Sequence, residues 1–97
     1  MYFAIRQYNM AVKKLDQGVL DRIANEFVPI LKSIPGFHAY HVIDTGDYEL
    51  VTVSAFETEE GEVASTDASA EWVGNNLTHL VAGTPTIISG EGVLNSK

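Results

Sequence analysis

The sequence predicts an α+β domain with the element order β-α-β-β-α-β, on the strength of three observations. Two segments carry apolar residues at spacings of three and four, as amphipathic helices do. Four short segments rich in β-branched and aromatic residues flank these helices. A Thr-Gly-Asp turn joins the two middle strand segments into a hairpin. The length of 97 residues predicts one domain, residues 1–97, around a single core.

The first half of the chain holds one strand and one helix. Residues 2–8 are apolar and aromatic, which predicts a strand. Asp16 is a suitable N-cap for a helix running to about residue 34. Pro29 lacks a backbone donor and clashes with the carbonyl four residues earlier, so we expect a kink or a split there. The apolar stripe of this helix comprises Val19, Ile23, Phe27, Ile30 or Leu31, and Ile34.

The second half begins with the hairpin. Residues 37–44 and 48–57 read as strands, and Thr45-Gly46-Asp47 between them is a turn in which glycine can take a positive φ. Thr58 can cap the second helix, and acidic residues crowd its first turn, where negative charge suits the helix dipole.

Weak helix formers predict irregular first turns in the second helix. From residue 68 the pattern is firmer, and Gly83 is expected to end the helix. Residues 84–94 form the last predicted strand, with a bulge expected at its two glycines, Gly90 and Gly92. The stripe expected to face the sheet comprises Ala70, Val73, Leu77 and Leu80.

This order, with right-handed crossovers, gives a ferredoxin-like fold: a four-stranded antiparallel sheet with both helices on one face. Both faces of the sheet are nevertheless apolar. Val51, Val53 and Ala55 point to one side, and Leu50 and Phe56 to the other. Two helices cover only one face, so we expect a second copy to cover the other in a homodimer. A partly apolar exposed face is the alternative.

Charge and composition exclude several function classes. The formal net charge of −7 argues against nucleic acid or an anionic membrane as the main partner. The absence of cysteine excludes disulfides, thiolate catalysis and Cys-ligated metal. No apolar run approaches the roughly 20 residues of a membrane span. The N-terminus lacks the pattern of a signal peptide. We therefore expect a soluble cytoplasmic protein.

One stretch of sequence resembles a known family. It runs Pro35-Gly36-Phe37-His38-Ala39-Tyr40, then a hairpin, then Val53-Ser54-Ala55-Phe56-Glu57 before an acidic helix start. The stretch is similar to the dimeric α/β-barrel superfamily, and within it to small antibiotic-biosynthesis-monooxygenase-like proteins. The resemblance implies a sheet-to-sheet dimer closing an α/β barrel. It also implies oxidation of an electron-rich aromatic compound by molecular oxygen, without metal or bound flavin.

Three residues of the second helix are candidates for the site. Trp72, Asn76 and His79 follow a spacing of four and three, so they share one helix face. In the functional interpretation Trp72 stacks a planar ligand, while Asn76 and His79 orient an oxygen or move a proton. The structural alternative is a tryptophan that seals the sheet edge or an interface beside two solvated polar neighbours.

The strands supply the remaining candidates. His38 and His41 lie three apart on a strand, so they point to opposite faces and cannot chelate one metal. We therefore predict no metal site. The alternation places His41 on the face of Phe37; one of the two histidines then faces the helices.

His41 and His79 are the predicted proton-transfer residues, and Tyr40, Arg6, Trp72 and Asn76 the predicted substrate-binding residues. The favoured structural alternative for Arg6 is an ion pair with Glu49, Glu57 or Glu91.

Two functions remain open at this stage. The first is a cofactor-independent, monooxygenase-like enzyme acting on a small aromatic or quinol-like compound. The second is a non-catalytic dimer that binds a small ligand or acts under stress. A pocket with two or more converging polar side chains favours the first, and a closed apolar interface favours the second.

Overall fold

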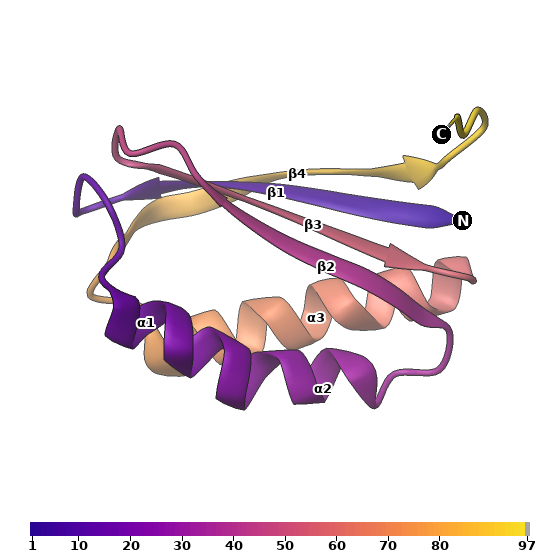
Figure 1. Ribbon diagram of the computed structural model, residues 1–97, viewed down its shortest axis with the longest axis horizontal. Coiled ribbons are helices and arrows are strands. Elements are labelled where there is room, and N and C mark those ends of the chain that lie inside the picture. Colours follow the sequence, from indigo (N-terminus) through magenta and orange to yellow (C-terminus); the bar gives the residue numbers. More distant parts are fainter. Residues whose placement is uncertain (97) are drawn as a thin grey trace.

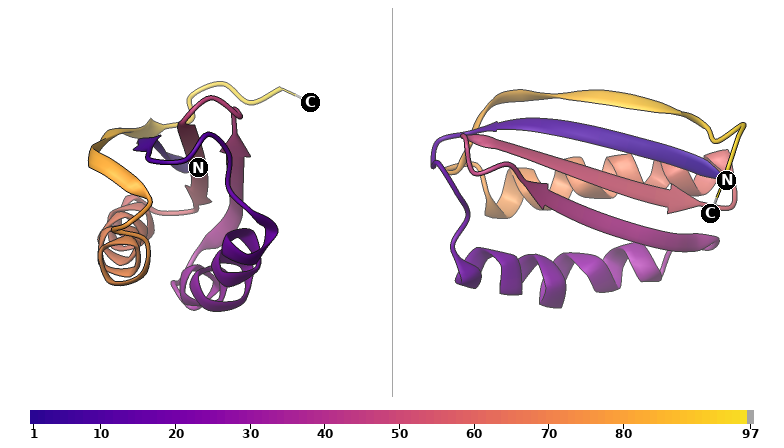
Figure 2. Two further views of the ribbon diagram at one scale, coloured as in Figure 1. Left: turned by 90° about the vertical axis from the view of Figure 1, so that its left-hand side faces the viewer. Right: turned by 45° about the horizontal axis from the view of Figure 1, so that its top comes forward.

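The computed structural model describes residues 1–96 and has the predicted ferredoxin-like order (Figure 1). Neighbouring strands pair antiparallel in one four-stranded sheet of order β2-β3-β1-β4. Both helical segments lie on the same face of this sheet, side by side (Figure 2). The elements are β1 (Tyr2–Met10), α1 (Gln17–Arg22), a π-helical turn (Ile23–Phe27), α2 (Val28–Lys32), β2 (Phe37–Asp44), β3 (Glu49–Phe56), α3 (Glu59–Asn76) and β4 (Val81–Glu91).

The first helix is split near Pro29, as predicted. Asp16 caps α1, its carboxylate accepting a hydrogen bond of 2.9 Å from the backbone nitrogen of Val19. The π-helical turn lies immediately before α2, which carries Pro29 in its first turn. Since proline has no N–H, the regular ladder of hydrogen bonds breaks here, and the wider turn accommodates the break.

The inner sheet face and the first helix enclose the main core. Alternate residues of β1 and β3 point toward the helices and are buried. Phe27 and Leu31 project from the first helix into the same core, whereas Ile30 is exposed, which settles the choice left open between Ile30 and Leu31. The buried apolar cluster comprises Tyr8, Met10, Leu15, Ile23, Phe27, Leu31, Leu50, Phe56, Trp72 and Leu77.

The stripe expected for α3 is only partly right. Leu77 is buried, and Val73 and Leu80 pack half-buried against the core, but Leu77 and Leu80 lie beyond the end of the helix. The helix is continuous from its N-cap at Thr58 and ends at Asn76, well before Gly83. Ala70 is exposed. The buried positions are mostly small or polar, namely Gly61, Glu62, Ser65, Ser69 and Trp72. Such a face is needed because polar side chains from the sheet project beneath this helix, as described below.

The bulge in β4 also lies elsewhere than expected. The strand spans Val81–Glu91, and its pairing with β1 is regular around Gly90. The irregularity lies near its start, where Gln7 pairs with Thr86 but Asn9 pairs with Ala82. Gly83 takes a φ of +75° within this segment, a conformation that glycine adopts without strain.

A second β-bulge, in β2, places the histidines differently from the prediction. The pairing of β2 with β3 shifts between Phe37 and Ala39, so the alternation predicted for this strand is interrupted. Phe37 turns toward the helices and packs edge-on against Phe56, with ring centroids 5.7 Å apart. His38 and His41 both line a hollow on the uncovered face of the sheet. Neither histidine faces the helices.

The uncovered face of the sheet is apolar, as the sequence predicted. Ile5, Ile43 and Ile88 are 39%, 49% and 63% exposed. Ile5 pairs directly with Ile88, so the two side chains stand together on this face. Within one copy of residues 1–96, nothing covers them.

The core assignment of Phe27 predicts a large loss of stability on truncation. Phe27 is 2% exposed, and Phe27→Ala is expected to lower the free energy of unfolding by about 3–5 kcal/mol because it leaves a cavity. Ile30 lies on the same helix but is 41% exposed, so Ile30→Ala is expected to cost less than about 1 kcal/mol. Urea unfolding of both variants measures the difference. Equal losses would show that the buried face of the helix is misassigned.

Candidate functional site

A cavity of about 250 Å³ lies between α3 and the first half of β4. Val73 and Gly74 of α3 form one wall, and the bulged segment of β4 forms the other. Arg6 and Tyr8 reach the cavity from β1. The lining residues are Arg6, Tyr8, Thr66, Ser69, Ala70, Val73, Gly74, Thr78, Val81, Gly83, Thr84, Pro85 and Ile87.

The bulge shapes the β4 wall of the cavity. The start of β4 lies beside α3 and bends from there into the sheet (Figure 2). The irregular pairing between residues 82 and 86 allows the strand to curve (Figure 2). Gly83, Thr84 and Pro85 lie in that curve and line the cavity. The sequence predicted a bulge in this strand, but at the wrong glycines.

Arg6 is the buried cation of the site and is only 1% exposed. Its Nη1 donates a hydrogen bond of 3.1 Å to Ser54 Oγ on β3. Its Nη2 donates to Ser65 Oγ and Thr66 Oγ1 on α3, both at 3.0 Å. Its Nε is buried and has no acceptor within residues 1–96. The guanidinium thus joins the sheet to α3 through hydroxyl groups alone.

The ion pair expected for Arg6 is absent from the described part of the chain. Arg22 and Glu26 form the ion pair found there, and Glu49 instead accepts a hydrogen bond from Gln7. The carboxylate closest in the network is that of Glu62, which accepts a hydrogen bond of 3.4 Å from the Thr66 hydroxyl. Burial lowers the pKa of Arg6, while the facing Tyr8, Tyr40 and Glu62 act in the opposite direction.

A smaller cavity of about 20 Å³ adjoins the first, deeper in the core. Tyr8 and Ser69 line both cavities, and the Tyr8 hydroxyl lies 3.1 Å from Ser69 Oγ. Tyr40 lines only the inner one and packs edge-on against Phe27, with ring centroids 5.6 Å apart. Burial raises the pKa of the Tyr40 phenol. This phenol therefore keeps its proton to higher pH than an ordinary tyrosine does.

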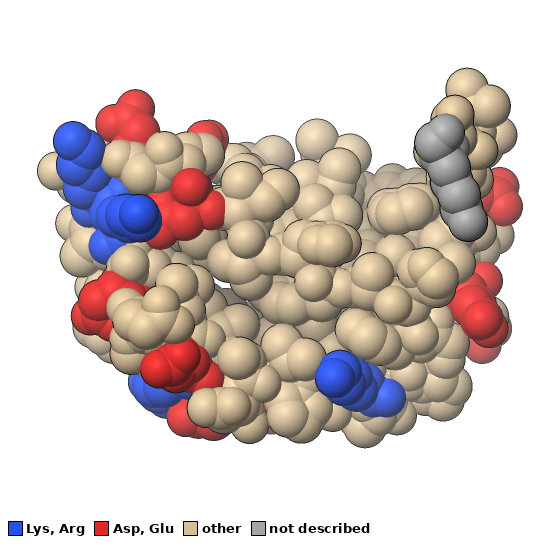
Figure 3. Space-filling model, in the orientation of Figure 1, with Lys and Arg blue, Asp and Glu red and all other residues tan. Residues whose placement is uncertain are grey.

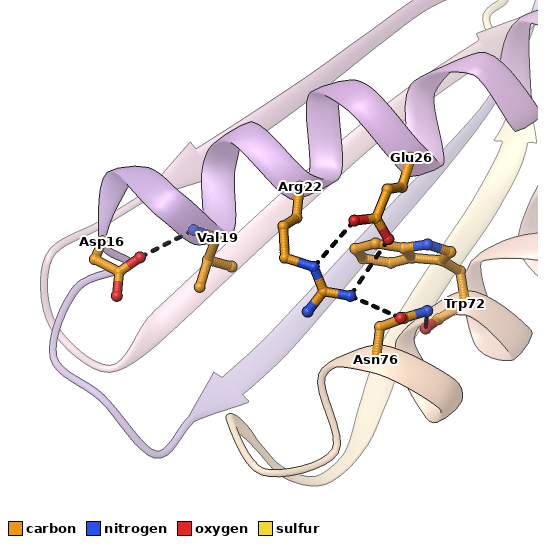
Figure 4. Close-up of polar contacts among 6 residues, drawn as sticks. All are labelled: Asp16, Val19, Arg22, Glu26, Trp72 and Asn76. Carbon is orange, nitrogen blue, oxygen red and sulfur yellow. Dashed lines mark hydrogen bonds and ion pairs between the residues drawn. The ribbon is translucent and has the colours of Figure 1, made fainter.

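Trp72 and Asn76 belong to a contact between the two helical segments (Figure 4). Trp72 is buried against Phe27, with ring centroids 5.5 Å apart, and the Arg22 guanidinium lies 5.8 Å from the centre of its ring. Arg22 Nη2 donates to Asn76 Oδ1 at 2.7 Å, and Asn76 Nδ2 donates to the Trp72 carbonyl at 2.9 Å. Trp72 lines the inner cavity but not the larger one.

The structure does not bring the predicted histidines to this cavity. His79 is exposed in the turn after α3, and His41 lies on the opposite face of the sheet. Neither lines the larger or the inner cavity. Of the predicted substrate-binding residues, Arg6 reaches the larger cavity, and Tyr40 and Trp72 the inner one.

Sequence reasoning missed the hydroxyl groups around Arg6. Ser54, Ser65, Thr66 and Ser69 each contact Arg6 or Tyr8. One signal was available: Ser65 and Ser69 are four residues apart on a helix, and an inward-facing arginine opposite them needs acceptors. Ser65 and Thr66 instead belong to the weak helix formers from which irregular first turns were predicted.

Charged side chains are unevenly placed on the face of the molecule that carries α1, α2 and β2, away from the cavity. Acidic and basic side chains gather toward the two ends of the face shown in Figure 3, and most of its middle is uncharged. Among residues 1–96 no three His, Cys, Asp or Glu side chains stand close enough together to hold a metal ion. None of the helices described there is both long and apolar enough to cross a membrane.

Comparison with solved structures shows the fold. A protein of unknown function from Nitrosomonas europaea, NE2512, superposes with a TM-score of 0.71 at 17% identity, over 99% of this chain and 92% of that one. A Streptomyces coelicolor monooxygenase from the gene ActVA-Orf6, in complex with Nanaomycin D, gives 0.69 at 13%, over 99% and 92%. SnoaB, a cofactor-independent oxygenase from Streptomyces nogalater, gives 0.65 at 8%, over 98% and 97%.

The chain therefore has the fold of antibiotic-biosynthesis-monooxygenase-like proteins, as the sequence resemblance implied. No protein-family model and no curated protein sequence matches it. At these identities the similarity establishes the backbone arrangement, and the chemistry must be argued from the side chains of this chain.

The raised pKa of Tyr40 predicts a loss of stability at alkaline pH. Tyrosines of the unfolded chain titrate near pH 10, whereas folded Tyr40 keeps its proton to higher pH. The unfolded state therefore binds fewer protons above pH 10, and stability falls there by up to about 1.4 kcal/mol per pH unit. Tyr40→Phe is expected to remove this part of the decline, as measured by urea midpoints at about pH 8 and about pH 11.

Tyr48→Phe is the control for this measurement, since Tyr48 is exposed in the hairpin turn. The stability of the Tyr48→Phe variant is expected to fall at alkaline pH as much as that of the unmodified protein. The same alkaline decline in the Tyr40→Phe variant would contradict a protonated, desolvated Tyr40.

Proposed function

We propose that the protein is an oxygenase that oxidises a small aromatic or quinol-like compound with molecular oxygen and without a bound cofactor. The observation that carries the proposal is the cavity between α3 and β4, which joins apolar walls to a polar end at Arg6, Tyr8 and Ser69. Support comes from the fold, which a cofactor-independent oxygenase and a monooxygenase in complex with Nanaomycin D also have.

The shape of the cavity favours a compound of one or two rings. Its volume of about 250 Å³ is near the lower end for small-molecule sites, which are roughly 300–1,000 Å³. Val73, Val81 and Ile87 give apolar contacts for a ring, and the polar end orients an oxygen substituent. Tyr40 and Trp72 close the inner extension, where Tyr40 can donate a hydrogen bond to a substrate oxygen.

The reaction that suits such a substrate begins with loss of the hydroxyl proton. The resulting phenolate carries electron density at its para carbon, which adds O₂, and the peroxide anion takes up a proton from solvent to give a hydroperoxide. Loss of the proton on the same carbon then forms the second carbonyl and breaks the O–O bond, and the hydroxide released takes up a second proton from solvent. One oxygen atom therefore enters the quinone and the other leaves as water. His79 and His41 lie outside the cavity, and we assign both protons to solvent.

Oxygen uptake tests this function directly. With 1-naphthol, the first of a panel of hydroxylated benzenes and naphthalenes, one O₂ is expected to be consumed for each naphthoquinone formed, and prior dialysis against a chelator is expected to leave the rate unchanged. Gly74 lines the cavity, and a Cβ added at this position would meet no other atom within 4 Å, so Gly74→Phe is expected to lower the rate at least tenfold by filling the cavity.

The control is Ala64→Phe, on an exposed position of the same helix outside the cavity, which is expected to keep the full rate. No oxygen uptake above the protein-free rate across the panel would contradict the oxygenase function. So would an unchanged rate in the Gly74→Phe variant.

A non-catalytic ligand-binding dimer is the second candidate. The observation that favours it is that neither a histidine nor a carboxylate lines the larger cavity. Ligand binding without oxygen uptake would select this function over the first.

We further propose that two copies pair through the uncovered sheet face. Ile5, Ile43 and Ile88 stand exposed on this face, and half-buried Val51 and Val53 lie on the strand between Ile43 and Ile5. Monomers rarely expose contiguous apolar patches of more than a few hundred Å². A two-fold contact between identical faces would bury roughly 2,000 Å² or more.

The dimer predicts a mass of twice 10.6 kDa by light scattering and a melting temperature that rises with protein concentration. Ile88→Lys is expected to give a monomer, because it places a charge in the apolar face beside its strand partner Ile5. Val63→Lys, at an exposed position of α3, is the matched control and is expected to stay dimeric. A stable monomer of the unmodified chain at micromolar concentration would contradict the pairing.

A further inference from the structure

We propose that Arg6 binds the oxyanion of the ligand, and that the cavity takes small aromatic carboxylates or phenolates in their ionised form. The inference rests on the proposed function for its cavity and substrate size. It does not require oxidation, since it concerns how the ligand is recognised.

The hydrogen bonds of Arg6 leave room for a ligand acceptor. A guanidinium carries five N–H groups, and Ser54, Ser65 and Thr66 accept from three of them. The N–H of Nε is buried without an acceptor in the described chain. Because Arg6 also lines the cavity, an oxygen placed at that end would supply the missing partner.

The charge around Arg6 leads to the same conclusion. Buried charges in proteins are normally paired, yet no carboxylate of residues 1–96 lies within ion-pair distance of this guanidinium. The groups that face it are the phenols of Tyr8 and Tyr40 and the carboxylate of Glu62, which reaches it only through the Thr66 hydroxyl. A ligand anion would therefore complete the pairing that the fold leaves open.

The residues that line the larger cavity also indicate that the ligand is ionised before it binds. The larger cavity contains no histidine and no carboxylate that could remove a proton from a bound hydroxyl. The site therefore selects compounds that are acidic enough to ionise in water, or compounds whose pKa is lowered by the facing Arg6 cation. Tyr8 and Ser69 add hydroxyl groups beside Arg6 to orient the oxyanion.

A pH titration of 4-nitrophenol binding tests the proposal, because the phenol and its phenolate have different absorption spectra. The phenolate is expected to bind at least tenfold more tightly than 4-nitroanisole, the methyl ether that cannot ionise. The bound probe is expected to ionise at lower pH than the free one. Equal affinity for the two compounds, or binding of neither these two nor 4-nitrobenzoate, would overturn the proposal.

Three variants tie this binding to Arg6. Arg6→Met keeps much of the side chain but removes the charge, and is expected to lower phenolate affinity at least tenfold and abolish the shift in ionisation. Arg6→Lys keeps the charge and is expected to keep the shift in ionisation of the bound phenol. This variant tests the role of the charge if Arg6→Met does not fold. Lys32→Met removes the same charge from an exposed position and is expected to bind as the unmodified protein does.

Further measurements distinguish carboxylate ligands from phenolate ligands. They also distinguish the role of Arg6 from the oxygenase function. Binding of 4-nitrobenzoate but not 4-nitrophenolate would assign the site to carboxylates, and the reverse to phenolates. Unchanged phenolate affinity in the folded Arg6→Met variant would overturn the role of Arg6 while leaving the oxygenase function intact. Phenolate binding at Arg6 without oxygen uptake by the panel would retain this inference and reject the oxygenase.

Discussion

The burial of one guanidinium governs the arrangement of this fold. Arg6 points inward from the central strand β1, where an apolar side chain would be the simplest occupant. Its charge must be solvated by the protein, so β3 and α3 supply hydroxyl acceptors at Ser54, Ser65 and Thr66. The helix that covers this half of the sheet consequently presents small polar residues to it. Packing there is looser, and polar atoms have room to meet a ligand.

The two halves of the helical layer therefore differ in character. Beneath α1 and α2 the core is aromatic and closed, with Phe27 packed against both Tyr40 and Trp72. Arg22 ties this half to α3 through Asn76 and the face of Trp72 (Figure 4). Beneath α3 and β4 the layer opens into the cavity. The closed half gives the domain its stability, and the open half keeps the space in which a ligand can be held.

Much of the fold could be predicted from the sequence, because local patterns determine most of it. The N-cap at Asp16, the break near Pro29 and the hairpin turn each follow from residue chemistry within a few positions. The small and polar part of the buried α3 face could not be predicted this way, since apolar periodicity marks a buried face only where the opposite layer is apolar. Arg6 makes that layer polar.

The candidate site was predictable only in part. Arg6 was a predicted substrate-binding residue, but its partners depend on which segment of α3 lies above it, and only the tertiary structure decides that. The histidines were misplaced because one bulge after Phe37 interrupts the alternation of β2. A single inserted residue of this kind leaves no clear mark in the sequence.

The most direct test of the central claim observes the Nε–H group of Arg6 itself. In a ¹H–¹⁵N spectrum of arginine side chains, this group is expected to be protected from exchange and to shift strongly as 4-nitrophenolate is added, while the exposed Arg22 is not affected. A titration in which the ligand binds but the Arg6 signal does not move would contradict the claim that this buried cation is the anchor of the site.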